Sequence, residues 1–161
     1  MNAIDLLESQ HRDVEDLFSE LESATDDETK ADLFEELADK LAVHAAIEEH
    51  HFYPAVKDQR TEDILLESLQ EHLAVKRILA DLLETGAEEE TFDAQVKVLK
   101  ETVEHHVEEE ETDLFPKVRK LLSKDQLEAI GQAMSAEQAE LEDRGAPHER
   151  IPSETDRAAS I

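Results

Sequence analysis

Four histidines occupy positions where the spacing of the sequence calls for an apolar side chain. Each lies on a hydrophobic stripe with helical periodicity, one per candidate helix: His11, His44, His72 and His106. Glu48 and Glu110 follow two of these histidines by four residues, so each His–Glu pair projects from one helix face about one turn apart. Imidazole and carboxylate groups are ligands for several transition metals, so this pattern indicates metal binding.

The joint pattern, rather than any one residue, carries this prediction. A single histidine on an apolar stripe is more often a hydrogen-bonded core residue, and glutamate is common throughout this chain. An unpaired carboxylate inside a helical bundle is costly, however, and two that face each other also repel. A pair of bound cations would remove both costs. The predicted metal ligands are His11, His44, Glu48, His72, His106 and Glu110.

The donor set also restricts the metal. The chain has no cysteine, which excludes thiolate ligands, disulfides and a thiol nucleophile. Imidazole with carboxylate suits iron, manganese or zinc, whereas calcium and magnesium prefer shells of oxygen alone. Carboxylates that bridge metals inside a four-helix bundle are typical of di-iron proteins. We therefore expect two non-haem iron ions, with manganese or zinc as alternatives.

Several further residues could act from outside the ligand set. His51 and Asp113 lie seven residues after His44 and His106 on the same face, so they either hydrogen-bond to a ligand or lie exposed at the bundle end. Core packing is the simpler role for Tyr53, with a hydroxyl near the site as the alternative. Three acids beside the motifs are expected mainly in solvent, with hydrogen bonds to the ligands as the alternative: Glu49, Glu71 and Glu111.

Five amphipathic segments are predicted to position these groups, over residues 2–23, 28–58, 62–85, 91–121 and 124–141. Their ends carry typical start and stop residues: Thr25-Asp26-Asp27 and Thr61 as caps, Gly86 as a terminator, and Ser123 with Gln126 as a capping box. Pro54 and Pro116 should kink or loosen the last turns of the second and fourth segments, because proline has no backbone N–H to donate.

An internal repeat relates the two halves of the predicted bundle. When the stretches that end at Pro54 and Pro116 are aligned, the two His–Glu pairs coincide. The stretches that begin at His11 and His72 match in the same way. Two helix pairs of related design are therefore predicted to pack about a pseudo-twofold axis. With a rise of about 1.5 Å per residue, the ligands of neighbouring helices fall within about one turn of the same level, so they can converge.

The composition favours one all-α domain. The 161 residues include only three glycines and four prolines, and the abundant Leu, Ala, Glu, Lys and Gln are good helix formers. We predict an up-down-up-down four-helix bundle over residues 1–122 and a short accessory fifth helix over 123–144. A flexible, mobile C-terminal tail is predicted over residues 145–161, where the periodicity ends.

The charge balance argues against several partners. The chain has 43 acidic residues against 16 Lys and Arg, a formal charge of −27, which would repel a nucleic-acid backbone and an anionic membrane surface. No apolar run reaches the roughly 18 residues that span a bilayer, and the first residues lack the layout of a signal peptide. We expect a soluble cytoplasmic protein; the sequence does not indicate its oligomeric state.

Residues 1–122 resemble the hemerythrin and hemerythrin-like HHE cation-binding family. The resemblance rests on His11, His44-x-x-x-Glu48 with Phe52-Tyr53-Pro54, Glu71-His72, and His106-x-x-x-Glu110 with Leu114-Phe115-Pro116. It implies that the four histidines are terminal ligands and that Glu48 and Glu110 bridge two irons. One departure is Lys76, which stands where the oxygen-carrying hemerythrins have a second histidine on the third helix. The resemblance therefore implies four histidines rather than five, and Lys76 either points to solvent or borders the open site.

Three hypotheses for function follow. The leading one is a non-haem di-iron protein that binds or reduces a small ligand, namely O2, NO or peroxide, as the resemblance implies. The second is storage or buffering of iron or another metal without redox turnover. The third is a structural bundle with an acidic interaction face. The sequence does not decide whether the protein is an enzyme.

Overall fold

A computed structural model describes residues 1–161, and the fold is all-α with no strand. The α-helices are α1 (Ala3–Ser23), α2 (Asp27–Ile47), α3 (Tyr53–Val56), α4 (Glu62–Thr85), α5 (Phe92–Glu109), α6 (Phe115–Leu121) and α7 (Lys124–Arg144). Two π-helical turns, η1 (Glu48–Phe52) and η2 (Glu110–Leu114), and one 3-10 helix, η3 (Pro147–Glu154), complete the chain.

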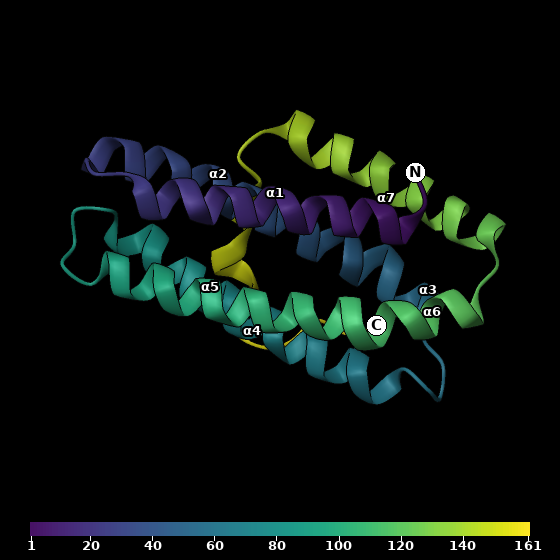
Figure 1. Cartoon of the computed structure of the whole chain (residues 1–161). Coiled ribbons are helices and arrows are strands. Elements are labelled where there is room, and N and C mark those ends of the chain that lie inside the picture. The colour runs from purple at the N-terminus through teal and green to yellow at the C-terminus, as the bar shows by residue number, and fades with distance from the viewer.

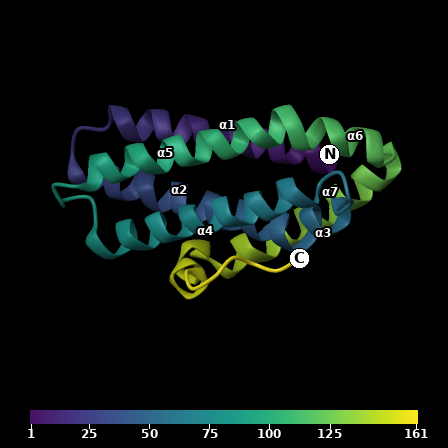
Figure 2. The same cartoon turned by 90° about the horizontal axis from the view of Figure 1, so that it is seen from below.

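Four long rods form the predicted up-down bundle. Figures 1 and 2 show α1, α2, α4 and α5 lying side by side, with α7 packed along the outside near α1. The tightest pairings are α1 with α2 and α4 with α5, which are the two helix pairs that the repeat predicted. The rods α2 and α5 are continued by η1–α3 and η2–α6, respectively.

Local chemistry sets most of the helix ends. The Asp26 carboxylate accepts the backbone N–H of Thr29 at 2.8 Å and starts α2, and Ser123 with Gln126 forms the predicted capping box of α7. Gly86 ends α4 with a φ of 84°, a conformation that favours glycine.

The Thr61 side chain does not form the predicted helix cap. It precedes α4, but its hydroxyl donates to the Val56 carbonyl at 2.9 Å instead of capping the helix.

The two late prolines coincide with π-helical turns. In η1 the backbone N–H of Tyr53 donates to the Glu48 carbonyl, five residues earlier, and in η2 the N–H of Phe115 donates to the Glu110 carbonyl. Pro54 and Pro116 follow directly and offer no N–H, so the ordinary α-helical bond at those positions is missing. The predicted loosening therefore takes the form of a π-turn, and each π-turn begins at one of the two predicted glutamate ligands.

The core is divided into two apolar clusters with the histidines between them. On α1, Leu7 belongs to one cluster and Val14 to the other, and the buried His11 lies between these two residues. On α2, Leu41 and Ile47 belong to different clusters in the same way, on either side of His44. Each cluster holds 17 or 18 buried residues, so the polar level is enclosed by hydrophobic packing on both sides.

The C-terminal segment corrects one prediction. The sequence predicts a mobile tail over residues 145–161, but Pro147–Glu154 form η3, which packs on α2 and α4. Ile151 is buried in the core, and Arg77 of α4 donates to the Thr155 carbonyl at 2.9 Å. Ile151 inserts into one core cluster and Ala158, Ala159 and Ile161 pack against the other, and these scattered apolar contacts follow no helical period that would predict the packing.

The accessory helix α7 packs closely against the N-terminal residues 1–3 at Gly131. A β-carbon at Gly131 would collide with the backbone of residues 1–3, so only glycine allows this contact. None of the helices is long and apolar enough to cross a lipid bilayer.

Candidate metal centre

The six predicted ligands converge at one level of the bundle. All six residues are at most 7% exposed, and they come from α1, α2, α4 and α5 with the two π-turns. Their ligand atoms form two groups, within each of which all atoms lie within 4.8 Å of one another. The first group is His11, His44, Glu48 and Glu110, and the second is Glu48, His72 and His106.

The two glutamates connect the histidine pairs. Glu48 places Oε1 at 3.1 Å from Nε2 of His44 and Oε2 at 2.9 Å from Nε2 of His72. Glu110 Oε1 lies 3.4 Å from Nε2 of His11 and 3.2 Å from Nε2 of His106. Each carboxylate therefore faces one histidine from each half of the bundle, which is the placement that a bridging ligand requires.

Every one of the four histidines has a polar partner on its outer nitrogen. Glu111 lies 3.0 Å from Nδ1 of His11, Glu49 lies 2.7 Å from that of His72, and Glu71 lies 2.9 Å from that of His106. For His44 the partner is the side-chain oxygen of Gln10, at 2.7 Å. An acceptor at Nδ1 holds the ring proton there and leaves the lone pair of Nε2 directed inward.

Several inward atoms have no hydrogen-bond partner in the protein. They are buried and are Nε2 of His11, Nε2 of His44, Oε1 of Glu48 and Oε1 of Glu110. Buried polar atoms without a partner are rare because each costs free energy. Neutral imidazole nitrogens and carboxylate oxygens are also the donor set of iron, manganese and zinc sites, so the residues fit a metal centre.

The four histidines and two glutamates form a ring of ligands, and their charges shift one another's pKa values. Burial alone would raise the pKa of the Glu48 carboxyl, but the charge of His44 and hydrogen bonds from neighbouring histidines hold that pKa well below its usual range. Burial would lower the pKa of His106, yet the charge and hydrogen bond of Glu110 outweigh it and raise the pKa well above its usual value. The metal-free ring thus draws protons onto histidines to balance its two acids.

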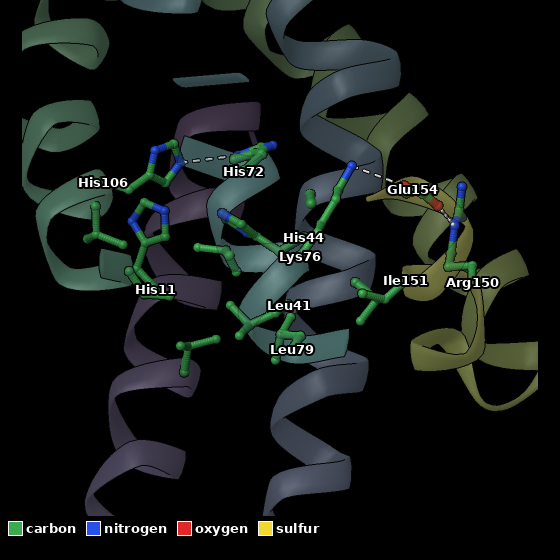
Figure 3. Close-up of a pocket in the computed structure, with 16 residues that line it drawn as sticks. His11, Leu41, His44, His72, Lys76, Leu79, His106, Arg150, Ile151 and Glu154 are labelled. Atoms are coloured by element: carbon green, nitrogen blue, oxygen red, sulfur yellow. Dashed lines mark hydrogen bonds and ion pairs between the residues drawn. The ribbon is translucent and has the colours of Figure 1, made fainter. Parts of the chain in front are cut away.

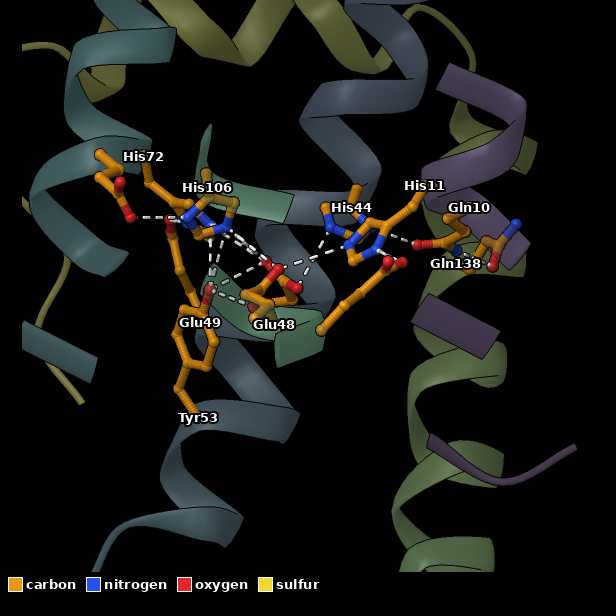
Figure 4. A network of polar contacts seen from close by, with 12 residues as sticks. Gln10, His11, His44, Glu48, Glu49, Tyr53, His72, His106 and Gln138 are labelled. Carbon is orange, nitrogen blue, oxygen red and sulfur yellow. Dashed lines mark hydrogen bonds and ion pairs between the residues drawn. The ribbon is translucent and has the colours of Figure 1, made fainter. Parts of the chain in front are cut away.

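Tyr53 places its hydroxyl at the site. Core packing alone was the simpler prediction for this residue, and the structure favours the alternative. Its hydroxyl lies 3.0 Å from Glu110 Oε2, 3.1 Å from Glu48 Oε2 and 3.2 Å from Nε2 of His72. Burial and the charges of both glutamates raise the pKa of the Tyr53 phenol well above its usual value, so it keeps its proton. Figure 4 shows the hydroxyl pointing into the ring from the π-turn side.

The three acids beside the motifs, Glu49, Glu71 and Glu111, were predicted mainly in solvent, but each faces the outer nitrogen of a ligand histidine. Glu49 is 6% exposed and accepts from Lys76 Nζ at 3.0 Å as well as facing His72. Glu111 also pairs with Arg12 on α1. The sequence could not rank these acids above the many others, because no apolar spacing marks them.

Two other candidates lie away from the ring. The His51 side chain pairs with Glu137 of α7 at 2.7 Å, and Asp113 pairs with Lys117 one turn along its own helix. Neither residue is hydrogen-bonded to one of the four ligand histidines; Asp113 is exposed as the alternative predicted, whereas His51 is partly buried against α7.

A narrow pocket with a volume of about 40 Å³ reaches the four histidines from the side of α2 and α4. Figure 3 shows Lys76, Arg150, Ile151 and Glu154 at its outer edge. Lys76 is only 8% exposed and its Nζ lies 3.0 Å from Glu154 of η3, so it borders the pocket rather than pointing to solvent. The apolar lining consists of Val14, Leu41, Ala42, Ala45, Val75, Leu79, Val103, Val107 and Ile151.

Comparisons with known proteins agree with this geometry. The family model described as "Hemerythrin HHE cation binding domain" matches residues 2–118. A solved structure of a protein containing that domain, the Rv2633c homolog from Mycobacterium kansasii, is similar with a TM-score of 0.79 and 26% identity, covering 96% of this chain and 94% of that one.

Two curated relatives are also similar in sequence. The uncharacterized protein Rv2633c of Mycobacterium tuberculosis is 30% identical over 149 residues, which cover 91% of this chain and 90% of that protein. A protein named DNA nickase from Nostoc sp. is 29% identical over 144 residues, which cover 89% of this chain. The match spans only 41% of the length of that nickase.

Proposed function

The chain belongs to the hemerythrin HHE cation-binding family, and from this premise we propose that it is a non-haem di-iron protein that binds or reduces a small ligand such as O2, NO or peroxide. The observation that carries the proposal is the ring itself. Four Nε2 atoms face two buried carboxylates, and several of these atoms lack any protein partner. The partnerless atoms belong to the first group, where one ion would satisfy them, and the second group would hold the other ion of the pair.

Each residue of the site would have a distinct role in holding the two ions or the ligand. His11 and His44 would hold one ion and His72 and His106 the other, with Glu48 and Glu110 between them. Ferrous ions would supply the electrons for any reduction of the ligand. The protonated Tyr53 hydroxyl lies within hydrogen-bond reach of both carboxylates and would hold a proton beside the bound ligand.

The pocket supports a small ligand. Nine of its 16 lining residues are hydrophobic, and its charged edge residues are paired with each other, Lys76 and Arg150 both with Glu154. Such a lining suits small uncharged molecules and keeps bulk water from the ring.

Storage of iron without redox turnover is the second candidate. The formal charge of −27 favours it, because an acidic surface attracts cations. The same excess of acid would repel a nucleic-acid backbone, so we do not extend the activity named for the Nostoc relative to this chain.

The test uses ferrous protein prepared without oxygen. Mixing it with air, azide or peroxide is expected to produce new charge-transfer absorption, because the pocket leaves the metal centre open to a ligand. Protein loaded with zinc serves as the control and should give no such bands. A featureless spectrum from the iron protein would overturn the proposal in favour of storage.

A further inference from the structure

One of the four ring histidines is held differently from the others. Carboxylates face the outer nitrogens of His11, His72 and His106, whereas the amide of Gln10 faces that of His44. A carboxylate can only accept, so it fixes the ring proton on Nδ1 without help. An amide can present either its oxygen or its NH2 group. Gln10 alone therefore does not determine which nitrogen of His44 carries the proton.

The orientation of the Gln10 amide decides whether His44 can bind a metal. With the oxygen toward Nδ1, the proton sits on Nδ1 and Nε2 keeps a free lone pair toward Glu48. With the NH2 group toward Nδ1, the neutral ring would carry its proton on Nε2 instead. The inward nitrogen would then have no lone pair to offer.

A hydrogen bond from the accessory helix α7 fixes the orientation of the Gln10 amide. The Gln10 amide nitrogen donates to Oε1 of Gln138 at 2.9 Å, and the Gln138 amide nitrogen donates to Oε1 of Glu142 at 2.9 Å. Glu142 is an exposed carboxylate and can only accept. It therefore orients Gln138. Gln138 in turn orients Gln10, which accepts from His44; Figure 4 shows these three residues.

We propose that Gln138 is a positioning residue of the metal centre: through Gln10 it holds His44 with its proton on Nδ1 and its Nε2 free for metal. The inference rests on the proposed metal binding and extends the site to α7, beyond residues 2–118 that the family model matches. It gives α7 a role that neither the bundle nor the ring requires.

The test compares Gln138→Leu with Gln138→Glu. Leucine has a similar size but ends the chain of hydrogen bonds, so Gln10 is free to turn over. Glutamate accepts from the Gln10 amide nitrogen without help from Glu142 and preserves the direction. The control is Gln132→Leu, an exposed position on the same helix.

Two measurements report the outcome. Nitrogen-15 NMR of the His44 ring in metal-free protein, recorded at a pH where the NMR signals themselves show a neutral ring, should show the Nδ1–H form in wild type and Gln138→Glu. It should show a mixture of both forms in Gln138→Leu. Zinc titration against a competing chelator should show about tenfold weaker binding of one of the two ions in Gln138→Leu, the ion at His11 and His44, at the low end of losses seen for such partners.

A further variant separates orientation from folding. Gln10→Glu combined with Gln138→Leu gives His44 a carboxylate partner like those of the other three histidines, so zinc affinity should return toward wild type. An unchanged His44 ring and unchanged zinc affinity in Gln138→Leu would overturn the positioning role and leave the metal centre standing. Failure of wild-type protein to bind any zinc or iron would instead remove the proposed function itself.

Discussion

Alanine in place of Glu48 is expected to reduce the iron content of purified protein from about two ions per chain to well below one. Glu48 contributes to both groups of ligand atoms, with one oxygen toward His44 and the other toward His72. Its removal would leave each ion with fewer anionic ligands and the pair without a shared one. Glu110→Ala should have the same effect, because its Oε1 faces both His11 and His106. Metal analysis of the purified variants measures this directly.

The matched control is Glu108→Ala, which removes an exposed glutamate two residues from Glu110 on the same rod. Its iron content should equal that of wild type. Circular dichroism should show that Glu48→Ala stays helical, because the variant also removes a buried charge that repels Glu110. Wild-type iron content in both ligand variants would exclude bridging carboxylates.

Removal of the metal by a chelator is expected to lower Tm by about 15–30 °C. An ion bound only by the folded state contributes about 4 kcal/mol at a free concentration about 1,000 times its Kd, and two ions therefore contribute about 8 kcal/mol. For a domain of this size each kcal/mol corresponds to about 2–4 °C. Calorimetry before and after chelation tests the prediction, and readdition of iron should restore the loss. An unchanged Tm would favour the structural bundle.

The difference in Tm should also grow with pH. In the metal-free protein, burial lowers the pKa of His11 and His72, but hydrogen bonds and charges from Glu110, Glu48 and Glu49 raise both above the usual value. The stability that these protonated histidines give is complete below about pH 6.5, their unfolded value, and is lost as the pH rises through the folded values.

Metal affinity instead increases with pH, because a histidine must be a neutral imidazole to bind a metal. Raising the pH from about 6 to about 8 therefore weakens the metal-free fold and strengthens the loaded one. A difference in Tm that stays constant across this range would show that the histidines do not exchange protons for metal.

The ring could be predicted from the sequence because its members break a strong pattern. A histidine such as His11 on an otherwise apolar stripe is conspicuous, and the duplicated His–Glu spacing fixes which faces must meet. The bundle followed from the same periodicity, and the comparisons confirm the family and the fold. The identity of the metal stays a prediction.

The surroundings of the ring could not be predicted in the same way. Glu49 and Gln10 are ordinary polar residues in sequence, and only the packing of neighbouring helices brings them to the outer nitrogens. Pro54 indicated a weakened turn but not that a π-turn would direct Tyr53 into the site. The buried Lys76 amine has its carboxylate partners, Glu49 and Glu154, on two other elements, which sequence spacing does not reveal.

Anomalous diffraction at the iron absorption edge, from crystals of iron-loaded protein, tests the central claim most directly. We predict two strong peaks inside the bundle, one beside His11 and His44 and the other beside His72 and His106, with Glu48 between them. A single internal peak would contradict the two-ion centre. Peaks confined to the partly exposed group of Glu67, Glu71, His105 and Glu109 would contradict the buried site altogether.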